Sequence, residues 1–248
     1  MTRFKLVLEY DGAGFVGWQR QATGVGVQQA VEEAVYAFSG ETPTVVAAGR
    51  TDSGVHALGQ VAHVDIEKTV PTGRVRDALN HFLRPRGVAV VGAEAVSDDF
   101  HARFSATERG YLYRILNRRA PPALDRGRVW WVPMALDADA MQAGARHLVG
   151  RHDFTSFRAS ECQADSPVKT LDHLAVARDG DEIHITARAL SFLHNQMRII
   201  AGTLQFVGQG KFTPEDVARA LNARARSAAG PTAPPEGLYL THVAYDGT

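Results

Sequence analysis

The run Arg3-Phe4-Lys5-Leu6-Val7-Leu8-Glu9-Tyr10 indicates the first element of the fold, because its large apolar side chains recur at every second position. This alternation predicts a β-strand with one buried face. In chain order, the sequence from there on predicts a helix over residues 27–38, strands over 44–48 and 60–66, a helix over 74–83 with Val75, Leu79 and Phe82 facing inward, and a strand over 88–96. The order βαββαβ is that of a ferredoxin-like domain.

The second half of the chain repeats this order. In chain order we expect a strand over residues 107–116, a helix over 138–149, strands over 171–177 and 182–190, a helix over 193–207, a further helix opening at Thr213-Pro214 and a last strand over 238–245. The sequence therefore predicts an α+β protein of two ferredoxin-like (RRM-like) α/β sandwich domains with mainly antiparallel sheets. We place the N-terminal domain at residues 1–105 and the C-terminal domain at 106–248.

Composition limits the class of protein. The 248 residues hold 27 lysines and arginines against 27 acidic residues, and 45% of them are hydrophobic, enough for packed cores. A single cysteine, Cys162, excludes a disulfide framework and a cysteine-rich zinc site and fits a reducing cytoplasm. No apolar run approaches the roughly 20 residues that span a bilayer. We expect a cytoplasmic protein without a membrane segment.

Zero net charge argues against a nucleic-acid partner only for the surface as a whole. Residues 100–128 carry seven arginines against two acidic residues, Glu108 and Asp125, and aromatic residues lie among them. Arginines interleaved with aromatic residues can hold phosphates and stack bases. A solvated, arginine-rich strand and loop is an equally good interpretation of the same stretch.

The loop Gly49-Arg50-Thr51-Asp52-Ser53-Gly54 contains the most informative carboxylate. Asp52 stands between glycines and near a cation, where a carboxylate can act as a nucleophile or a general base. The same residues also fit an ordinary turn. The histidines lack the spacing of metal ligands, so we expect no metal site.

Several motifs occur together in a fixed order. They are Glu9–Gly12, Gly17–Gln21, Val27-Gln28, Gly49–Asp52 with Gly54–His56, Gly59–Val61, Asp99–Ala106, Tyr111 with Tyr113, Phe154–Phe157, Phe192–Arg198 and Glu236–Leu240. With this set the chain resembles the tRNA pseudouridine synthase I family, the TruA type, along nearly its whole length. The resemblance implies the pseudouridine synthase fold.

The resemblance also implies an activity: isomerisation of uridine to pseudouridine at nucleotides 38, 39 and 40 of the tRNA anticodon arm, without cofactor or metal. Asp52 matches the family's nucleophile. Tyr111 matches an aromatic residue that stacks on the flipped uracil, and Arg198 matches an arginine that pairs with the aspartate.

Further matches concern RNA binding. The residues that match substrate-binding positions of the family are Arg50, Phe100, His101, Ala102, Arg103, Phe104, Glu161, Cys162 and Gln163. Asp165 departs from the family pattern, where a basic residue is expected. The resemblance implies a homodimer that binds the tRNA anticodon stem-loop. Two rival functions remain: a non-catalytic RNA-binding protein with duplicated RRM-like domains, and an aspartate-dependent hydrolase of a small metabolite.

Overall fold

The structure is a computed structural model and describes residues 1–246. The chain forms two compact units, one of residues 1–107 with the C-terminal stretch from Tyr239, the other of residues 108–238. The predicted domains, 1–105 and 106–248, follow the repeated element order rather than compactness, and they remain a prediction.

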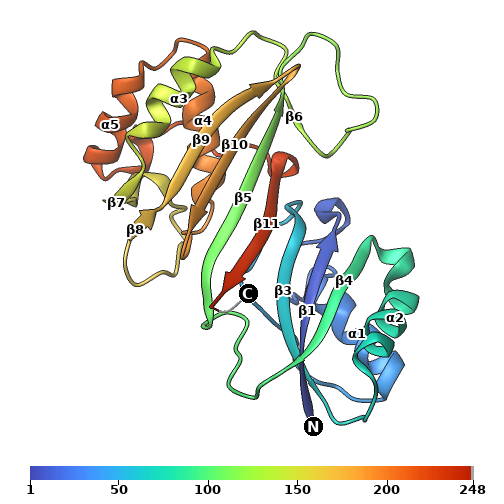
Figure 1. The fold of residues 1–248 in the computed structure, drawn as a ribbon. Coiled ribbons are helices and arrows are strands. Elements are labelled where there is room, and N and C mark those ends of the chain that lie inside the picture. Colours follow the sequence, from blue (N-terminus) through green and yellow to red (C-terminus); the bar gives the residue numbers. More distant parts are fainter. Residues whose placement is uncertain (247–248) are drawn as a thin grey trace. The chain divides into compact units, whose positions relative to one another are not determined.

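The first unit is built on a mainly antiparallel sheet in the order β4-β1-β3 (Figure 1). Its strands are β1 (Thr2–Tyr10), β3 (His56–Ile66) and β4 (Val88–Val96). The short strand β2 (Val46–Ala47) pairs antiparallel with β3, and β11 (Leu238–Tyr245) pairs with β3 in parallel. Helices α1 (Val27–Ser39) and α2 (Thr72–Leu83) complete the unit.

The alternation read from β1 builds the core of this unit. Phe4, Leu6, Leu8 and Tyr10 are at most 3% exposed, as predicted. In α2 the buried residues are Val75, Leu79 and Leu83. The prediction that Phe82 faces inward is wrong, because the buried stripe advances by four residues and leaves Phe82 39% exposed.

The second unit has an antiparallel sheet in the order β5-β10-β9 (Figure 1). Its strands are β5 (Ala106–Leu116), β9 (His173–Asp179) and β10 (Glu182–Ala189), with the short β6 (Trp130–Trp131) parallel to β5. Strands β7 (Gly150–Asp153) and β8 (Val168–Leu171) form a separate two-stranded sheet. The helices are α3 (Ala138–Arg146), α4 (Gln196–Gly208) and α5 (Pro214–Ala223). The mixed α+β class with mainly antiparallel strands is confirmed.

Short 3₁₀ turns occur at Gly12–Gly14, Arg84–Arg86, Thr155–Phe157, Arg226–Ala228 and Pro235–Gly237. Helix α5 begins at a capping box in which Thr213 and Asp216 satisfy each other's backbone N–H groups. Within residues 1–246, no helix is long and apolar enough to cross a bilayer.

Candidate active site

The loop of residues 48–55, called the aspartate loop below, connects β2 to β3 in the first unit. The Val55 N–H donates to the Asp52 carbonyl oxygen at 3.1 Å, and Gly54 adopts a φ of +77°. This closes a tight turn directly after Asp52. Asp52 is half-buried, whereas Arg50 and Ser53 are exposed.

The segment that follows β1 holds the aspartate loop by its backbone. The Trp18 N–H donates to the Thr51 carbonyl oxygen at 3.0 Å, and the Ser53 hydroxyl donates to the Phe15 carbonyl oxygen at 3.2 Å. Gly12 permits a still closer approach, because a Cβ at this position would lie 2.1 Å from the Val55 carbonyl oxygen. Two motifs distant in sequence therefore fix one loop.

A buried polar network lies beneath the same loop. The Tyr10 hydroxyl and the Thr51 hydroxyl are 2.8 Å apart, and the Gln60 side-chain amide donates to the Gly49 carbonyl oxygen at 2.8 Å. Burial raises the pKa of Tyr10 to about 12, so its phenol stays protonated at neutral pH. From the sequence, Tyr10 and Gln60 were predicted as strand residues without a role at the site. The available signal was the position of Gln60, a polar residue at the start of the predicted strand 60–66.

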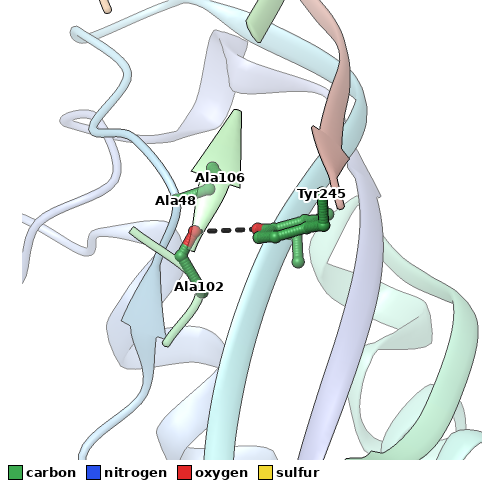
Figure 2. Close-up of a cluster of buried hydrophobic side chains, with 5 residues drawn as sticks. Ala48, Ala102, Ala106 and Tyr245 are labelled. Atoms are coloured by element: carbon green, nitrogen blue, oxygen red, sulfur yellow. Dashed lines mark hydrogen bonds between the residues drawn. The ribbon is translucent and has the colours of Figure 1, made fainter. Parts of the chain in front are cut away.

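Residues 100–104, predicted to contact RNA, are anchored on both sides of Ala102. The Tyr245 hydroxyl donates to the Ala102 carbonyl oxygen at 2.8 Å (Figure 2), and the Ala102 N–H donates to His63 Nδ1 at 3.1 Å. Ala102 also lies in a buried apolar cluster with Ala48 and Tyr245, against which Phe100 packs. Burial, followed by the nearby positive charges, lowers the pKa of His63, so a neutral imidazole serves as the acceptor.

Beyond this anchor the segment presents polar and aromatic groups to solvent. His101 Nδ1 accepts from the N–H groups of Arg103 and Phe104 at 3.2 and 3.3 Å, which leaves its proton on Nε2. Phe104 is 76% exposed, and the Arg103 guanidinium lies 5.5 Å from the centre of its ring. An exposed ring beside a cation can stack a base and hold a phosphate.

The second unit carries the other residues matched to catalysis. Tyr111 on β5 meets Phe192 edge to face, with ring centres 4.9 Å apart. Arg198 on α4 donates from Nε to the Ala233 carbonyl oxygen at 2.8 Å and from Nη1 to Asn195 Oδ1 at 2.9 Å. The predicted catalytic residues are thus divided between the units, with Asp52 in the first and Tyr111 and Arg198 in the second.

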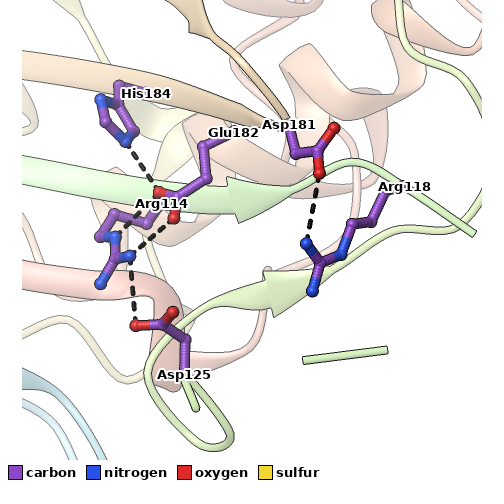
Figure 3. Close-up of polar contacts among 6 residues, drawn as sticks. All are labelled: Arg114, Arg118, Asp125, Asp181, Glu182 and His184. Carbon is purple, nitrogen blue, oxygen red and sulfur yellow. Dashed lines mark hydrogen bonds and ion pairs between the residues drawn. The ribbon is translucent and has the colours of Figure 1, made fainter. Parts of the chain in front are cut away.

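Part of the arginine-rich stretch is neutralised within the second unit. Arg114 forms a bidentate pair with Glu182 at 2.9 and 2.7 Å and also reaches Asp125, while Arg118 pairs with Asp181 at 3.2 Å (Figure 3). The hydrogen bonds from Arg114 lower the pKa of Glu182. For these two arginines, the alternative of a structural role for the basic stretch is the correct one.

The loop of Glu161, Cys162 and Gln163 leads towards β8. The Cys162 N–H donates to the Ala159 carbonyl oxygen at 3.1 Å, and the Ala159 N–H donates to the His194 carbonyl oxygen at 3.0 Å. The loop is therefore tied to the residues just before α4. Over the described part of the chain, no cluster of three or more histidine, cysteine or carboxylate side chains is arranged to hold a metal ion.

Comparison with known proteins shows which family this chain is similar to. The family model described as tRNA pseudouridine synthase matches residues 6–105 and 145–246. A protein named tRNA pseudouridine synthase A from Rhodospirillum centenum is 62% identical over 245 residues, covering 99% of this chain and 100% of its own. The protein of the same name from Paramagnetospirillum magneticum is 60% identical over 248 residues, covering 100% and 97%. That from Rhodospirillum rubrum is 58% identical, covering 100% and 89%.

Proposed function

The chain belongs to the tRNA pseudouridine synthase family, and on that premise we propose that it isomerises uridine to pseudouridine at nucleotides 38, 39 and 40 of the tRNA anticodon arm. The observation that carries the proposal is the aspartate loop. A single carboxylate, Asp52, stands on a loop that is held by backbone hydrogen bonds and by a buried polar network. A rigid loop is what a catalytic carboxylate needs, because displacing it by about 1 Å can cost a hundredfold in rate.

The proposed reaction balances without an outside reagent. The bond between uracil N1 and ribose C1′ breaks, the uracil turns, and a bond forms between C5 and C1′. The proton on C5 is lost and N1 gains a proton. No electrons are transferred and no group leaves, so the reaction calls for no redox cofactor. Asp52 starts the sequence by attacking the sugar or the base, or by removing a proton from the sugar.

The target uridine must leave the base stack before Asp52 can reach it, at a cost of a few kcal/mol. We assign Tyr111 to stack on the flipped uracil. Its support is that an aromatic ring, half-buried on β5 and braced by Phe192, offers one fixed apolar face. We assign Arg198 to pair with Asp52 and keep the carboxylate ionised. Its support is a guanidinium whose orientation two hydrogen bonds fix.

We assign tRNA binding to residues 100–104, Arg50 and the loop of Glu161, Cys162 and Gln163. In the first of these segments Phe100 and Ala102 pack inward and hold the chain, and Arg103 and Phe104 are exposed for contact. The partner is the tRNA anticodon stem-loop. We also propose, from the family resemblance, that the enzyme is a cytoplasmic homodimer.

Position-resolved detection of pseudouridine tests the function. A tRNA with uridines at 38, 39 and 40 is incubated with the protein alone, alongside matched tRNAs in which each of these is replaced by cytidine. We expect pseudouridine at these positions and at no uridine outside the anticodon arm. Tight binding with no pseudouridine would instead favour the non-catalytic RNA-binding protein.

A further inference from the structure

The residue that opens helix α4 has an unusual backbone. Asn195, the N-cap, has φ 60° and ψ 6°, and among residues 1–246 only Arg224 is also a non-glycine residue with positive φ. An N-cap is normally extended, and its side chain accepts a backbone N–H from the first turn. Asn195 departs from both, since its backbone is left-handed and its side chain makes no capping hydrogen bond. Helix initiation therefore does not explain this residue.

The Asn195 side chain is used on Arg198 instead. Its Oδ1 accepts from Arg198 Nη1 at 2.9 Å, one helical turn along α4. The neighbouring Gln196, 1% exposed, folds back so that its side-chain oxygen accepts from the Leu193 N–H at 2.8 Å. Gln196 thus ties the turn together, and Asn195 is left to orient the arginine.

The opposite edge of the guanidinium rests on a fixed segment. Arg198 Nε donates to the Ala233 carbonyl oxygen at 2.8 Å, and the Ala233 N–H donates back to the Arg198 carbonyl oxygen at 3.0 Å. The stretch before Ala233 packs directly on α4, since a Cβ on Gly202 would lie 1.9 Å from the Pro231 carbonyl oxygen. Held from both sides, the guanidinium cannot turn about its long side chain.

The chemistry of the two acceptors is as informative as their positions. Both are neutral oxygens, one from an amide side chain and one from the backbone. Neutral acceptors fix the direction of the guanidinium and add no negative charge of their own beside it. Arg114 in the same unit is held differently, by the carboxylate of Glu182.

We propose that Asn195 is a positioning residue for the isomerisation, whose left-handed backbone and amide oxygen hold the Arg198 guanidinium in its working orientation. This inference rests on the proposed function, which gives Arg198 its role towards the catalytic carboxylate. Asparagine meets both requirements at once, because it tolerates the left-handed region better than most residues and carries a neutral acceptor.

Two substitutions separate positioning from folding. Asn195→Gly keeps the backbone conformation at no steric cost but removes the acceptor. We expect its unfolding midpoint to stay at or above that of wild type, while kcat falls on the order of ten- to a hundredfold with little change in KM. Asn195→Asp keeps the acceptor but adds a negative charge beside the guanidinium, so kcat should fall here as well. Arg224→Gly, at the other left-handed position, is the matched control and should keep wild-type kcat.

Steady-state kinetics on tRNA, run together with thermal unfolding of each variant, decide the matter. Wild-type kcat in Asn195→Gly would overturn the inference, as would a loss of kcat that follows a loss of stability. Arg198→Gln is measured beside them. If Arg198→Gln loses activity and Asn195→Gly does not, the positioning role of Asn195 is refuted while the proposed role of Arg198 stands. If Arg198→Gln keeps full activity, the proposed role of Arg198 fails and positioning fails with it.

Discussion

The hydrogen bond between Tyr10 and Thr51 gives the sharpest test of how the aspartate loop is held. Both residues are buried, Tyr10 at 3% and Thr51 at 7% exposure, and their hydroxyls are 2.8 Å apart. Tyr10→Phe leaves the Thr51 hydroxyl without this partner, and Thr51→Val leaves the phenol with only a long 3.4 Å contact to Gln60. Each single change should cost about 1–3 kcal/mol in the free energy of unfolding, the penalty for a buried group left unpaired.

The double variant removes both hydroxyls and leaves neither unpaired. Its cost should therefore be smaller than the sum of the single costs by about 1 kcal/mol or more. Urea denaturation of wild type, the two single variants and the double variant gives this coupling energy. Because Thr51 precedes Asp52, each single variant should also lower kcat on tRNA more than it raises KM. Strictly additive unfolding energies, together with unchanged kcat, would refute the claim that this network holds the loop.

Three further predictions concern the loop, the RNA-contacting segment and the arginines. Gly17→Ala should lower the free energy of unfolding by about 1–2 kcal/mol or more and also lower kcat. The reason is that φ at Gly17 is +106° and the new Cβ would lie 2.8 Å from the Thr51 carbonyl oxygen of the aspartate loop. The control is Gly73→Ala in α2, where a Cβ meets nothing within 4 Å, and it should be neutral or stabilising in the same urea denaturation assay. The pKa of His63 is lowered by folding, so its contribution to stability is complete above the ordinary value of 6.5 and is lost as the pH falls from there towards the lowered pKa of the folded state. Between pH 7.5 and 5.5 wild type should lose more unfolding free energy than His63→Gln, and equal losses would contradict a lowered pKa. The affinity for tRNA should fall steeply as the salt concentration rises. In binding titrations over a range of salt, Arg103→Gln should reduce the slope of log affinity against log salt concentration by about one. Arg118→Gln should leave that slope unchanged, because Arg118 pairs with Asp181.

Sequence patterns predict the elements of this fold better than the contacts between them. Alternation identified β1 and helical spacing identified α1, because these patterns follow from which face of an element is buried. Helix α5 was located from its start at Thr213-Pro214. Short strands such as β6 and β7 escaped, since two to four residues carry too little periodicity. The predicted helix at 193–207 starts only at Gln196, because Asn195 is left-handed.

At the site, too, single residues could be predicted from the sequence and the contacts between them could not. Asp52 and residues 100–104 could be singled out from their motifs, but their supports could not. Tyr245 lies 143 residues from the Ala102 that it anchors, and no local pattern connects them. The arginine-rich stretch left two interpretations open for a related reason, since Glu182, which pairs with Arg114, lies 68 residues away. Charge counts along a chain do not include partners that only folding brings close.

The central claim is that the Asp52 carboxylate performs the isomerisation, and one measurement tests it most directly. Wild type and Asp52→Asn are incubated with tRNA in which uracil C5 carries tritium, and release of the label to water is followed without added metal or cofactor. In parallel, the binding of each protein to the same tRNA is titrated. We predict turnover by wild type, none by Asp52→Asn, and equal tRNA affinity for the two proteins. Label release by Asp52→Asn at the wild-type rate would contradict the account.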